Sequence, residues 1–480
     1  MTNIKSQEQT IYRALAAQIQ MGFFDDETPF PSVMEIAQQY GASYCPAQRA
    51  LKMLERDGII KINRKKSSVI ISKPYPDYLT SGVFMERAAS LEDLNKTLEL
   101  ISPAVCFYIL SRLDDRLTET AGSECENTHC ARQLYGSFFQ MLKSCGNQTL
   151  LGLFYDIHSF ADSAFLDILQ QTDGEEPADH LLQHLLAEFQ KCMQSYQSKD
   201  SCASKQHFIK LSRTFHGRIA SYFEHMTFST ADNTLTPFVW EPCKGRTRYF
   251  DMIAMEIICK ISQGRYPLGT FLPSYKLLSS TYHVSISTMR RTVGILNELG
   301  ILRTINGKGS QVISECGTEA LQKFEDYMSD SYFINFIEIL QTLAAFSEPV
   351  IMYTFPYFDA GTLESIHNAA SLGDDKKALE EVLCITLQAI VSHCPLNAVK
   401  EIYSKIILQM LSGSILRFED AGSRQLPGWS KIACDIAESC EKRDASQFAS
   451  SFCHLTENAF MITRRLLSKA GIECSGNIKL

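Results

Sequence analysis

Residues 272–300 read LPSYKLLSSTYHVSISTMRRTVGILNELG and predict a helix-turn-helix unit. Ser274 stands where a serine N-cap opens a helix, and a short turn at residues 282–285 follows that helix. Ser285 begins the next helix, whose apolar positions recur at helical spacing until Gly300 ends it. Two helices joined by a short turn in this way make a helix-turn-helix unit.

The same pattern occurs a second time, 242 residues earlier and without a gap. Matching positions are Gly22 with Gly264, Pro31-Ser32 with Pro273-Ser274, Tyr40 with Tyr282, Ser43 with Ser285, and Gly58 with Gly300. A repeat of this period is far longer than a solenoid unit, so it implies duplication of a whole multi-element module. We therefore expect two halves, residues 1–240 and 241–480, that are built alike.

Local signals in the first copy predict three helices. Residues 11–22 carry apolar side chains at helical spacing and end on a glycine. Ser32 and Glu35 form a capping box for a second helix, and Ser43 caps a third that stops at Gly58. The first copy thus follows the same helical plan as the second.

A two-stranded ribbon follows the third helix in both copies. In the first copy, alternation at Ile60 and Ile62 leads to a basic turn at residues 64–66 and a second strand at 69–71. In the second, the turn lies at residues 306–310 and begins with Asn-Gly, the strongest short hairpin signal. Helix, helix-turn-helix and hairpin in this order predict a winged helix, which lays its third helix in the major groove of DNA.

Both copies resemble the DNA-binding domain of GntR-family bacterial transcription regulators. The segments of the second copy that match the family pattern are Leu272-Pro-Ser274, Val284-Ser285, Thr288-Met-Arg290, Leu299-Gly-Ile301 and Gly307-Lys-Gly-Ser310. The resemblance covers about 65 residues in each half and is stronger in the second copy. It implies that the protein binds a double-stranded DNA operator.

The resemblance implies DNA contacts from helix N-termini, the third helix and the wing. In the second copy the candidates are Ser274, Lys276, Ser285, Ser287, Thr288, Arg290, Arg291, Gly307, Lys308 and Gly309. In the first copy they are Ser32, Ser43, Tyr44, Gln48, Arg49, Lys65 and Lys66. Where the family has three cations, the second copy keeps Lys276 and Arg290, and the first keeps none. We expect DNA readout by the first copy to differ or to be weaker, although Gln48 could read an adenine edge.

Charge also separates the two copies. Residues 246–314 hold nine Lys and Arg against three Asp and Glu, a net charge of +6, in a chain whose net charge is −8. Residues 9–72 hold eight against six, a net charge of +2. Because phosphate attraction supplies most non-specific affinity for DNA, we expect the second copy to anchor the complex.

The remaining residues of each half are predicted to be helical, because apolar residues recur at i, i+3 and i+4 and period-2 runs are scarce. The fold class is therefore mainly α, with two winged helix-turn-helix domains each followed by an all-helical bundle. The expected domains are residues 1–74, 75–240, 241–314 and 315–480, with a linker between the halves near residues 229–245. This plan is similar to FadR-type members of the family, in which the helical domain binds an effector and mediates dimerisation.

No metal or other cofactor is expected. Many helical domains of this type bind a metal through an Asp four residues before a His, but Leu134 and Phe138 occupy the corresponding places. His454 resembles a last ligand, yet a lone histidine is more often structural. The cluster Cys125-Glu-Asn-Thr-His129-Cys130 has no second cysteine pair nearby, as a zinc site would need, and is interpreted as a loop.

Composition is that of a globular cytoplasmic protein, with 45% hydrophobic and 21% charged residues. The 16 cysteines are scattered and expected to be reduced, although a redox-sensing pair stays open. We expect no enzyme, since the sequence holds no nucleophile elbow, phosphate-binding loop or HExxH pattern.

The sequence thus predicts a transcriptional regulator that is a pseudo-dimer in one chain. Its two winged helices would read one operator, and its helical domains would bind a small-molecule effector. An alternative stays open, in which only the second winged helix binds DNA and the first contacts protein. A homodimer of the duplicated chain is also open.

Overall fold

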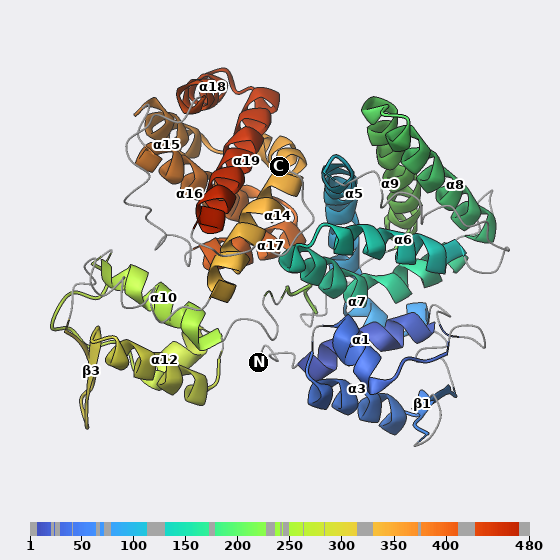
Figure 1. Cartoon of the computed structure of the whole chain (residues 1–480), viewed down its shortest axis with the longest axis horizontal. Helices are drawn as coiled ribbons and strands as arrows, with labels where there is room; N and C mark the ends of the chain where they lie inside the picture. Colours follow the sequence, from blue (N-terminus) through green and yellow to red (C-terminus); the bar gives the residue numbers. More distant parts are fainter. Residues whose placement is uncertain are drawn as a thin grey trace.

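The computed structural model describes residues 7–20, 24, 29–40, 42–63, 68–71, 78–112, 130–171, 178–226, 236–240, 242, 249–262, 264–282, 284–313, 330–372, 376–410 and 428–469. Two lobes lie side by side, and each combines a helical bundle with a winged helix (Figure 1). The predicted wing residues Lys65 and Lys66, and residues 125–129 of the cysteine cluster, fall outside the described residues. Mainly helical architecture with two small sheets confirms the predicted fold class.

The first winged helix consists of α1 (Gln7–Gln20), α2 (Val33–Gln39), α3 (Tyr44–Arg56), β1 (Ile60–Lys61) and β2 (Val69–Ile70). The predicted capping box is present, since Ser32 accepts from the amide of Glu35 and the Glu35 carboxylate accepts from the amide of Ser32. Ser43 occupies the N-cap of α3 but makes no side-chain cap hydrogen bond. The two strands pair antiparallel, with Ile60 opposite Ile70.

The second winged helix consists of α10 (Tyr249–Ser262), α11 (Tyr275–Thr281), α12 (Ile286–Glu298), β3 (Leu302–Ile305) and β4 (Gly309–Val312). Its strands pair antiparallel with Leu302 opposite Val312, and Phe271 bridges to Gln311 beside them. Each winged helix has its own apolar core, formed where its helices and hairpin meet.

The helical part of the first half begins with η1 (Tyr78–Thr80) and α4 (Gly82–Met85). Five long helices follow, α5 (Ala88–Leu110), α6 (Cys130–Ser144), α7 (Gln148–Gln171), α8 (Ala178–Gln197) and α9 (Ser201–Glu224). In this bundle α9 packs against both α5 and α8. Apolar residues at helical spacing predicted these elements correctly.

The second half contains α14 (Asp330–Thr354), η4 (Phe355–Tyr357), α15 (Ala360–Ser371), α16 (Lys376–His393), α17 (Asn397–Met410), α18 (Trp429–Lys442) and α19 (Ala445–Lys469). Here α19 packs against both α14 and α18, as α9 does against α5 and α8. Residues 334–357 are long and apolar enough to span a membrane, but most of the segment is buried inside the fold. That burial is what a core helix of the bundle requires.

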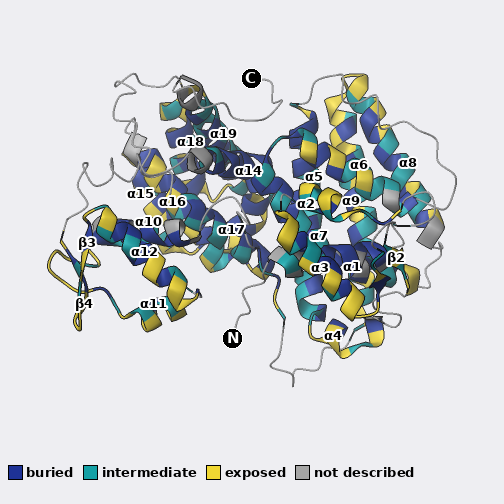
Figure 2. Ribbon diagram, turned by 60° about the horizontal axis from the view of Figure 1, so that its bottom comes forward, coloured by how far each residue is buried: buried dark blue, intermediate teal, exposed yellow. Residues whose placement is uncertain are grey.

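The two helical bundles share one continuous apolar core, which extends from Leu79 in the first half to Leu455 in the second. Helix α14 lies against α5 at the centre of the molecule, where burial is highest (Figure 2). Across the same boundary α14 contacts α7, and α5 contacts α17. The halves are therefore joined through a packed interior.

Two carboxylates, one from each half, accept hydrogen bonds from the opposite half across this boundary. Glu338 of α14 accepts hydrogen bonds from the amide (3.0 Å) and hydroxyl (2.8 Å) of Thr149 at the start of α7. Asp93 of α5 accepts from the amides of Asn397 and Ala398, both at 2.7 Å, at the start of α17. Each carboxylate satisfies amides that have no partner within their helix and meets the positive end of its dipole. Burial raises the pKa of Asp93, while the two amides oppose that rise.

The described part of the predicted linker is held by both halves. The amide of Thr236 donates to the carbonyl of Glu86 (2.9 Å), and Phe238 packs edge-on against Phe160. Trp240 is fully buried, and its amide donates to Glu401 of α17 (3.1 Å). Residues 236–240 of the expected linker are therefore packed between the halves.

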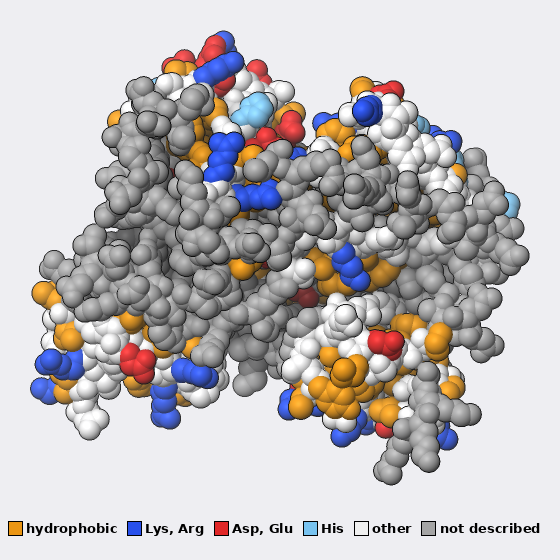
Figure 3. Space-filling view, viewed as in Figure 1, with side chains coloured by type: hydrophobic (Ala, Val, Ile, Leu, Met, Phe, Trp, Pro, Cys, Tyr) orange, Lys and Arg blue, Asp and Glu red, His pale blue; other side chains and the backbone are white. Residues whose placement is uncertain are grey.

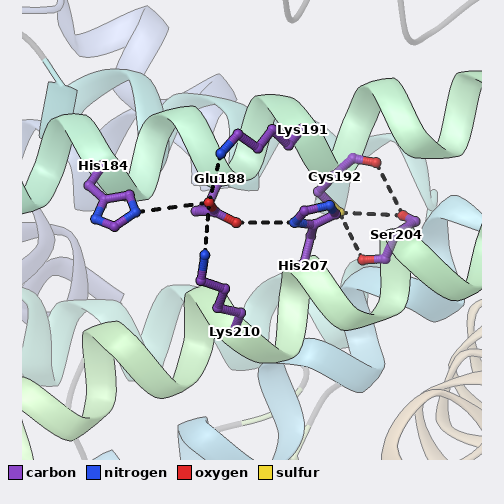
Figure 4. Close-up of polar contacts among 7 residues, drawn as sticks. All are labelled: His184, Glu188, Lys191, Cys192, Ser204, His207 and Lys210. Atoms are coloured by element: carbon purple, nitrogen blue, oxygen red, sulfur yellow. Dashed lines mark hydrogen bonds and ion pairs between the residues drawn. The ribbon is translucent and has the colours of Figure 1, made fainter.

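Helices α8 and α9 are also tied by a buried carboxylate. Glu188 is 3% exposed and lies among Lys191 (3.0 Å), His207 (3.1 Å) and Lys210 (3.1 Å), as Figure 4 shows. Hydrogen bonds from these groups, that of Lys191 first, lower the pKa of Glu188 to about 2. Beside it the thiol of Cys192 contacts Ser204 (3.4 Å). This network fixes the register of α8 on α9.

Candidate nucleic-acid interface

Four of the predicted DNA-contacting hydroxyls of the second copy gather at two helix N-termini. Ser274 caps α11 by accepting from the amide of Leu277 (3.3 Å), and Ser285 caps α12 by accepting from that of Thr288 (3.1 Å). The hydroxyls of Ser287 and Thr288 lie 2.7 and 2.8 Å from that of Ser285. Helix N-termini of this kind bind phosphate through free amides and a favourable dipole.

The cationic candidates of the second copy are accessible to solvent. Lys276, Arg290 and Arg291 are all exposed, on α11 and α12. Arg291 is held from behind, because its guanidinium lies 4.3 Å from the ring centre of Phe250 on α10. Arg290 is also exposed on α12, the helix that occupies the place of a recognition helix.

The wing of the second copy has the backbone geometry that close approach to phosphate requires. Gly307 and Gly309 both have positive φ, at 78° and 120°, a region that residues with a Cβ rarely adopt. A Cβ on Gly309 would lie 3.6 Å from the ring of Phe271. Lys308 is exposed between the two glycines, so the tip presents one cation and an open backbone.

The first copy presents a less cationic surface at the matching positions. Ser32, Ser43 and Tyr44 are exposed, and Gln48 is half-buried on α3. Arg49 is exposed but pairs with Glu8 at 3.0 Å, which offsets its charge. Among the described candidates of the first copy, Arg49 is the one cation, and it is paired.

Both winged helices occupy the same side of the molecule, below the helical bundles in Figure 1. Figure 3 shows Lys and Arg side chains along the lower edge of both domains in the same view. We call the two winged helices the first and second heads, and the second carries the larger net positive charge in the sequence.

The first winged helix is docked on its helical bundle more extensively than the second. Helix α1 packs along α7, whereas α10 makes a smaller contact with α17. The ring of Tyr40, at the end of α2, lies 5.5 Å from that of Tyr155 on α7. Burial raises the pKa of Tyr155 to about 12, so this contact is made by neutral rings near pH 7.

The repeat itself explains this difference in docking. Ala14 and Gln18 of α1 are 7% and 5% exposed, although neither belongs to the apolar core of its own domain. The positions 242 residues later are Glu256 and Lys260, which form an ion pair at 2.6 Å that stays partly exposed. Lys260 also donates to Tyr282 (3.0 Å), the counterpart of Tyr40. Neutral residues can be buried on α7 at little cost, whereas an ion pair cannot.

A cavity of about 190 Å³ lies inside the first helical bundle, where α5, α6, α7, α8 and α9 face one another. Leu134 and Phe138, which stand where the resemblance would place metal ligands, line it. Within the described ranges no three His, Cys, Asp or Glu side chains form a group that could hold a metal. His454 is exposed on α19, and Cys130 is buried at the start of α6.

Sequence reasoning missed two features of the interface and one next to it. Arg291 contacts Phe250, and Phe271 bridges to the wing sheet; both contacts join distant elements, and no sequence pattern indicates them. The docking of the first head had a readable signal, namely Ala14 and Gln18 in place of Glu256 and Lys260 at matched positions. That signal becomes meaningful only when α7 is known to lie against them.

Comparisons with known proteins agree with this geometry. The family model "Bacterial regulatory proteins, gntR family" matches residues 7–70 and again residues 250–312. The chain is 34% identical over 122 residues to the HTH-type transcriptional regulator TreR of Bacillus subtilis (strain 168), covering 24% of this chain and 51% of TreR. The chain thus spans about half the length of this curated relative.

Similar solved structures also come from GntR-type proteins. A GntR-family transcriptional regulator from Pseudomonas syringae pv. tomato is 14% identical, with 46% of this chain and 88% of that chain covered and a TM-score of 0.22. A Streptococcus agalactiae GntR protein is 14% identical, with 44% and 99% covered and a TM-score of 0.22.

Proposed function

Since this chain is a tandem GntR-type regulator, with the family's domain at residues 7–70 and again at 250–312, we propose that it acts as a single-chain pseudo-dimer on operator DNA. In this proposal each winged helix reads one half-site. The helical bundles set the distance between the heads, and an effector bound in a bundle changes the affinity for DNA. The site of action is the cytoplasm, where a bacterial operator lies.

The reciprocal carboxylate contacts carry this proposal. In a two-fold dimer, a residue of one subunit contacts a helix of the other, and the same contact recurs in reverse. Asp93 of α5 binds the start of α17, and Glu338 of α14 binds the start of α7. The two carboxylates lie 245 residues apart along the chain and form such a pair. The packing of α14 on α7 and of α5 on α17 follows the same rule. The boundary between the halves therefore supports an interface of the dimer kind.

The inequality of the heads supports an operator with two unlike half-sites. Arg290 and Lys276 give the second head free cations where Gln48 and Met34 stand in the first. A head with Arg in its recognition helix favours guanine contacts, and one with Gln favours adenine. The second head would supply most of the affinity for DNA. The first would lengthen the DNA sequence that is recognised and so increase selectivity.

The experiment is selection of random duplex DNA with the full chain at near-physiological salt, followed by sequencing of the retained pool. We expect a motif with two unlike half-sites at a fixed spacing. The variant Gln48→Ala should reduce sequence preference in one half-site, and Arg290→Ala should reduce it in the other. Lys431→Ala changes an exposed residue of α18 and should leave the motif unchanged. A single half-site that Gln48→Ala does not alter would contradict two-headed binding. Failure to retain any sequence would contradict operator binding altogether.

A further inference from the structure

The cavity of the first bundle has a size that suits a small ring. Its volume of about 190 Å³ exceeds the roughly 150 Å³ of an engineered apolar protein cavity that binds benzene. A molecule of one ring with a small substituent would fill it.

The described residues that line the cavity include no Lys, Arg, Asp or Glu side chain. Leucine and phenylalanine side chains dominate the wall, among them Leu134, Phe138 and Phe165. A carboxylate ligand would therefore lose its hydration without a cation or metal from this wall to replace it, which is costly. The lining favours an uncharged ligand.

His216 lines the cavity, and a buried partner determines which of its ring nitrogens accepts a hydrogen bond. Its Nδ1 lies 2.7 Å from Oδ1 of Asn95, an atom that only accepts, so Nδ1 carries the ring proton and Nε2 keeps a lone pair. Nδ2 of Asn95 donates to the His216 carbonyl (2.9 Å), which fixes the amide in that orientation. Burial, and then the nearby His158, lower the pKa of His216 to about 3, so the ring is neutral near pH 7. A ligand hydroxyl or N–H is the natural partner of such a nitrogen.

Two aromatic rings connect this wall to the first winged helix. Phe139 contacts the cavity-lining Tyr135 (4.4 Å) and His158 (4.9 Å) on one side. On the other it stacks on Tyr155 at 4.7 Å, with 15° between the ring planes. Tyr155 in turn contacts Tyr40 of the first head. Because packed interiors have low compressibility, we expect a shift of α6 or α7 at the cavity to move this head or to break the contact.

We infer that this cavity binds a small, uncharged, ring-containing molecule with one hydrogen-bond donor, and that its occupancy is transmitted through Phe139 and Tyr155 to the first winged helix. The inference rests on the proposed function only in that the bound molecule would serve as the effector. Binding itself, and its effect on the first head, do not require DNA.

Calorimetry with the full chain tests the ligand class by comparing the binding of phenol, toluene and benzoate, each of which contains one benzene ring. We expect phenol to bind at one site per chain and toluene to bind about tenfold more weakly, as the loss of one hydrogen bond implies. Benzoate should show no binding over the same concentrations. His216→Phe should reduce the advantage of phenol over toluene to about nothing. Tighter binding of benzoate, or no binding of phenol and toluene, would overturn the inference.

Filling the cavity provides the matched control for location. Ser102→Leu places new atoms in the cavity wall, whereas Ala104→Leu adds a similar volume on the same helix α5 outside the lining. Phenol binding should be lost in the first and kept in the second. Ala131→Leu, on α6, repeats the test if Ser102→Leu does not fold. Unchanged phenol binding in a folded filled variant places the site elsewhere and overturns the inference.

Hydrogen exchange tests transmission without DNA. Phenol should alter amide exchange in α1, α2 and α3 of the wild-type chain. In Tyr155→Leu phenol affinity should stay within about threefold while the effect on these helices disappears. Tyr222→Leu changes a half-buried tyrosine of α9 whose ring contacts Phe84 rather than Phe139 or Tyr155, and it should preserve both. An effect confined to α5–α9 contradicts transmission. If phenol acts as expected but no DNA is retained by selection, the operator proposal alone fails.

Discussion

The Glu338 carboxylate accepts both the amide and the hydroxyl hydrogen bond of Thr149, across the boundary between the two halves of the chain. Asn147 strengthens the same contact by donating to the Glu338 carbonyl (2.8 Å) and to Gln341 (3.0 Å). Thr149 and Glu338 are only 7% and 6% exposed, so neither has water as a ready substitute partner. Polar groups buried in this way specify one arrangement of the halves, because any other would leave them unsatisfied.

Removing either boundary carboxylate should destabilise the protein. Glu338→Ala leaves the amide and hydroxyl of Thr149 without a partner, so we expect the free energy of unfolding to fall by about 2–3 kcal/mol. Asp93→Ala should cost a similar amount on the opposite side of the boundary. Urea denaturation measures both. Glu348→Ala, exposed on the same helix α14, should change stability by less than about 0.5 kcal/mol, and equal losses in all three variants would refute the role given to the carboxylates.

Arg290 should matter more for DNA binding than any residue of the first head. Loss of a guanidinium that contacts a base or phosphate costs about 1–3 kcal/mol, so Arg290→Ala should weaken the affinity for the selected duplex by about tenfold or more. Lys276→Ala should also lower the dependence of affinity on salt by about one phosphate contact. Fluorescence anisotropy at several salt concentrations gives both values. A larger loss for Gln48→Ala would reverse the proposed ranking of the heads.

Exchanging matched residues between the repeats should undock the first head. Ala14→Glu with Gln18→Lys gives α1 the ion pair of α10, and burying it on α7 should cost about 3 kcal/mol or force the head away. Proteolysis and amide exchange of residues 7–56 should then increase. The reverse exchange, Glu256→Ala with Lys260→Gln, removes a partly exposed pair and should cost less than about 1 kcal/mol. Equal effects of the two exchanges would count against this account of docking.

His216 should make the protein less stable in acid. Its pKa is about 3 in the folded chain and 6.5 when unperturbed, so below pH 6.5 the unfolded state binds one more proton than the folded state. The free energy of unfolding should therefore fall as pH falls from 6.5 towards 3, by about 1.4 kcal/mol per pH unit from this group. His216→Phe should remove that part of the slope. His225→Gln, at an exposed histidine of the same bundle, should leave it in place.

Much of the fold could be predicted from the sequence, because the signals are local. Ser32 with Glu35, Ser285 with Thr288, and Asn306-Gly307 each specify a cap or a turn within a few residues, and all three take that form. The 242-residue repeat then extended the prediction from one half to the other. The residues proposed to contact DNA follow from this framework together with the family resemblance.

The relation between the halves could not be predicted in the same way. Asp93 and Glu338 lie on helices whose own sequence patterns give no sign of the partner, and their partners are backbone amides. Trp240 lies in a segment whose turn residues predicted a linker, and no local pattern indicates that its side chain is fully buried. The cavity depends on side chains from five helices and has no spacing pattern at all.

Residues 236–240 give the assembly a property that separate subunits lack. A conventional dimer falls apart on dilution, so its activity depends on how many copies a cell makes. Here Thr236 and Trp240 fasten one peptide segment to both halves, so under the proposed pseudo-dimer the pairing of the halves is an intramolecular step with a high effective concentration. A cell could therefore keep only a few molecules of this protein and still have every one of them paired. Because both halves are encoded in one chain, a substitution can occur in one half without occurring in the other. The matched positions Gln18 and Lys260 differ in this way.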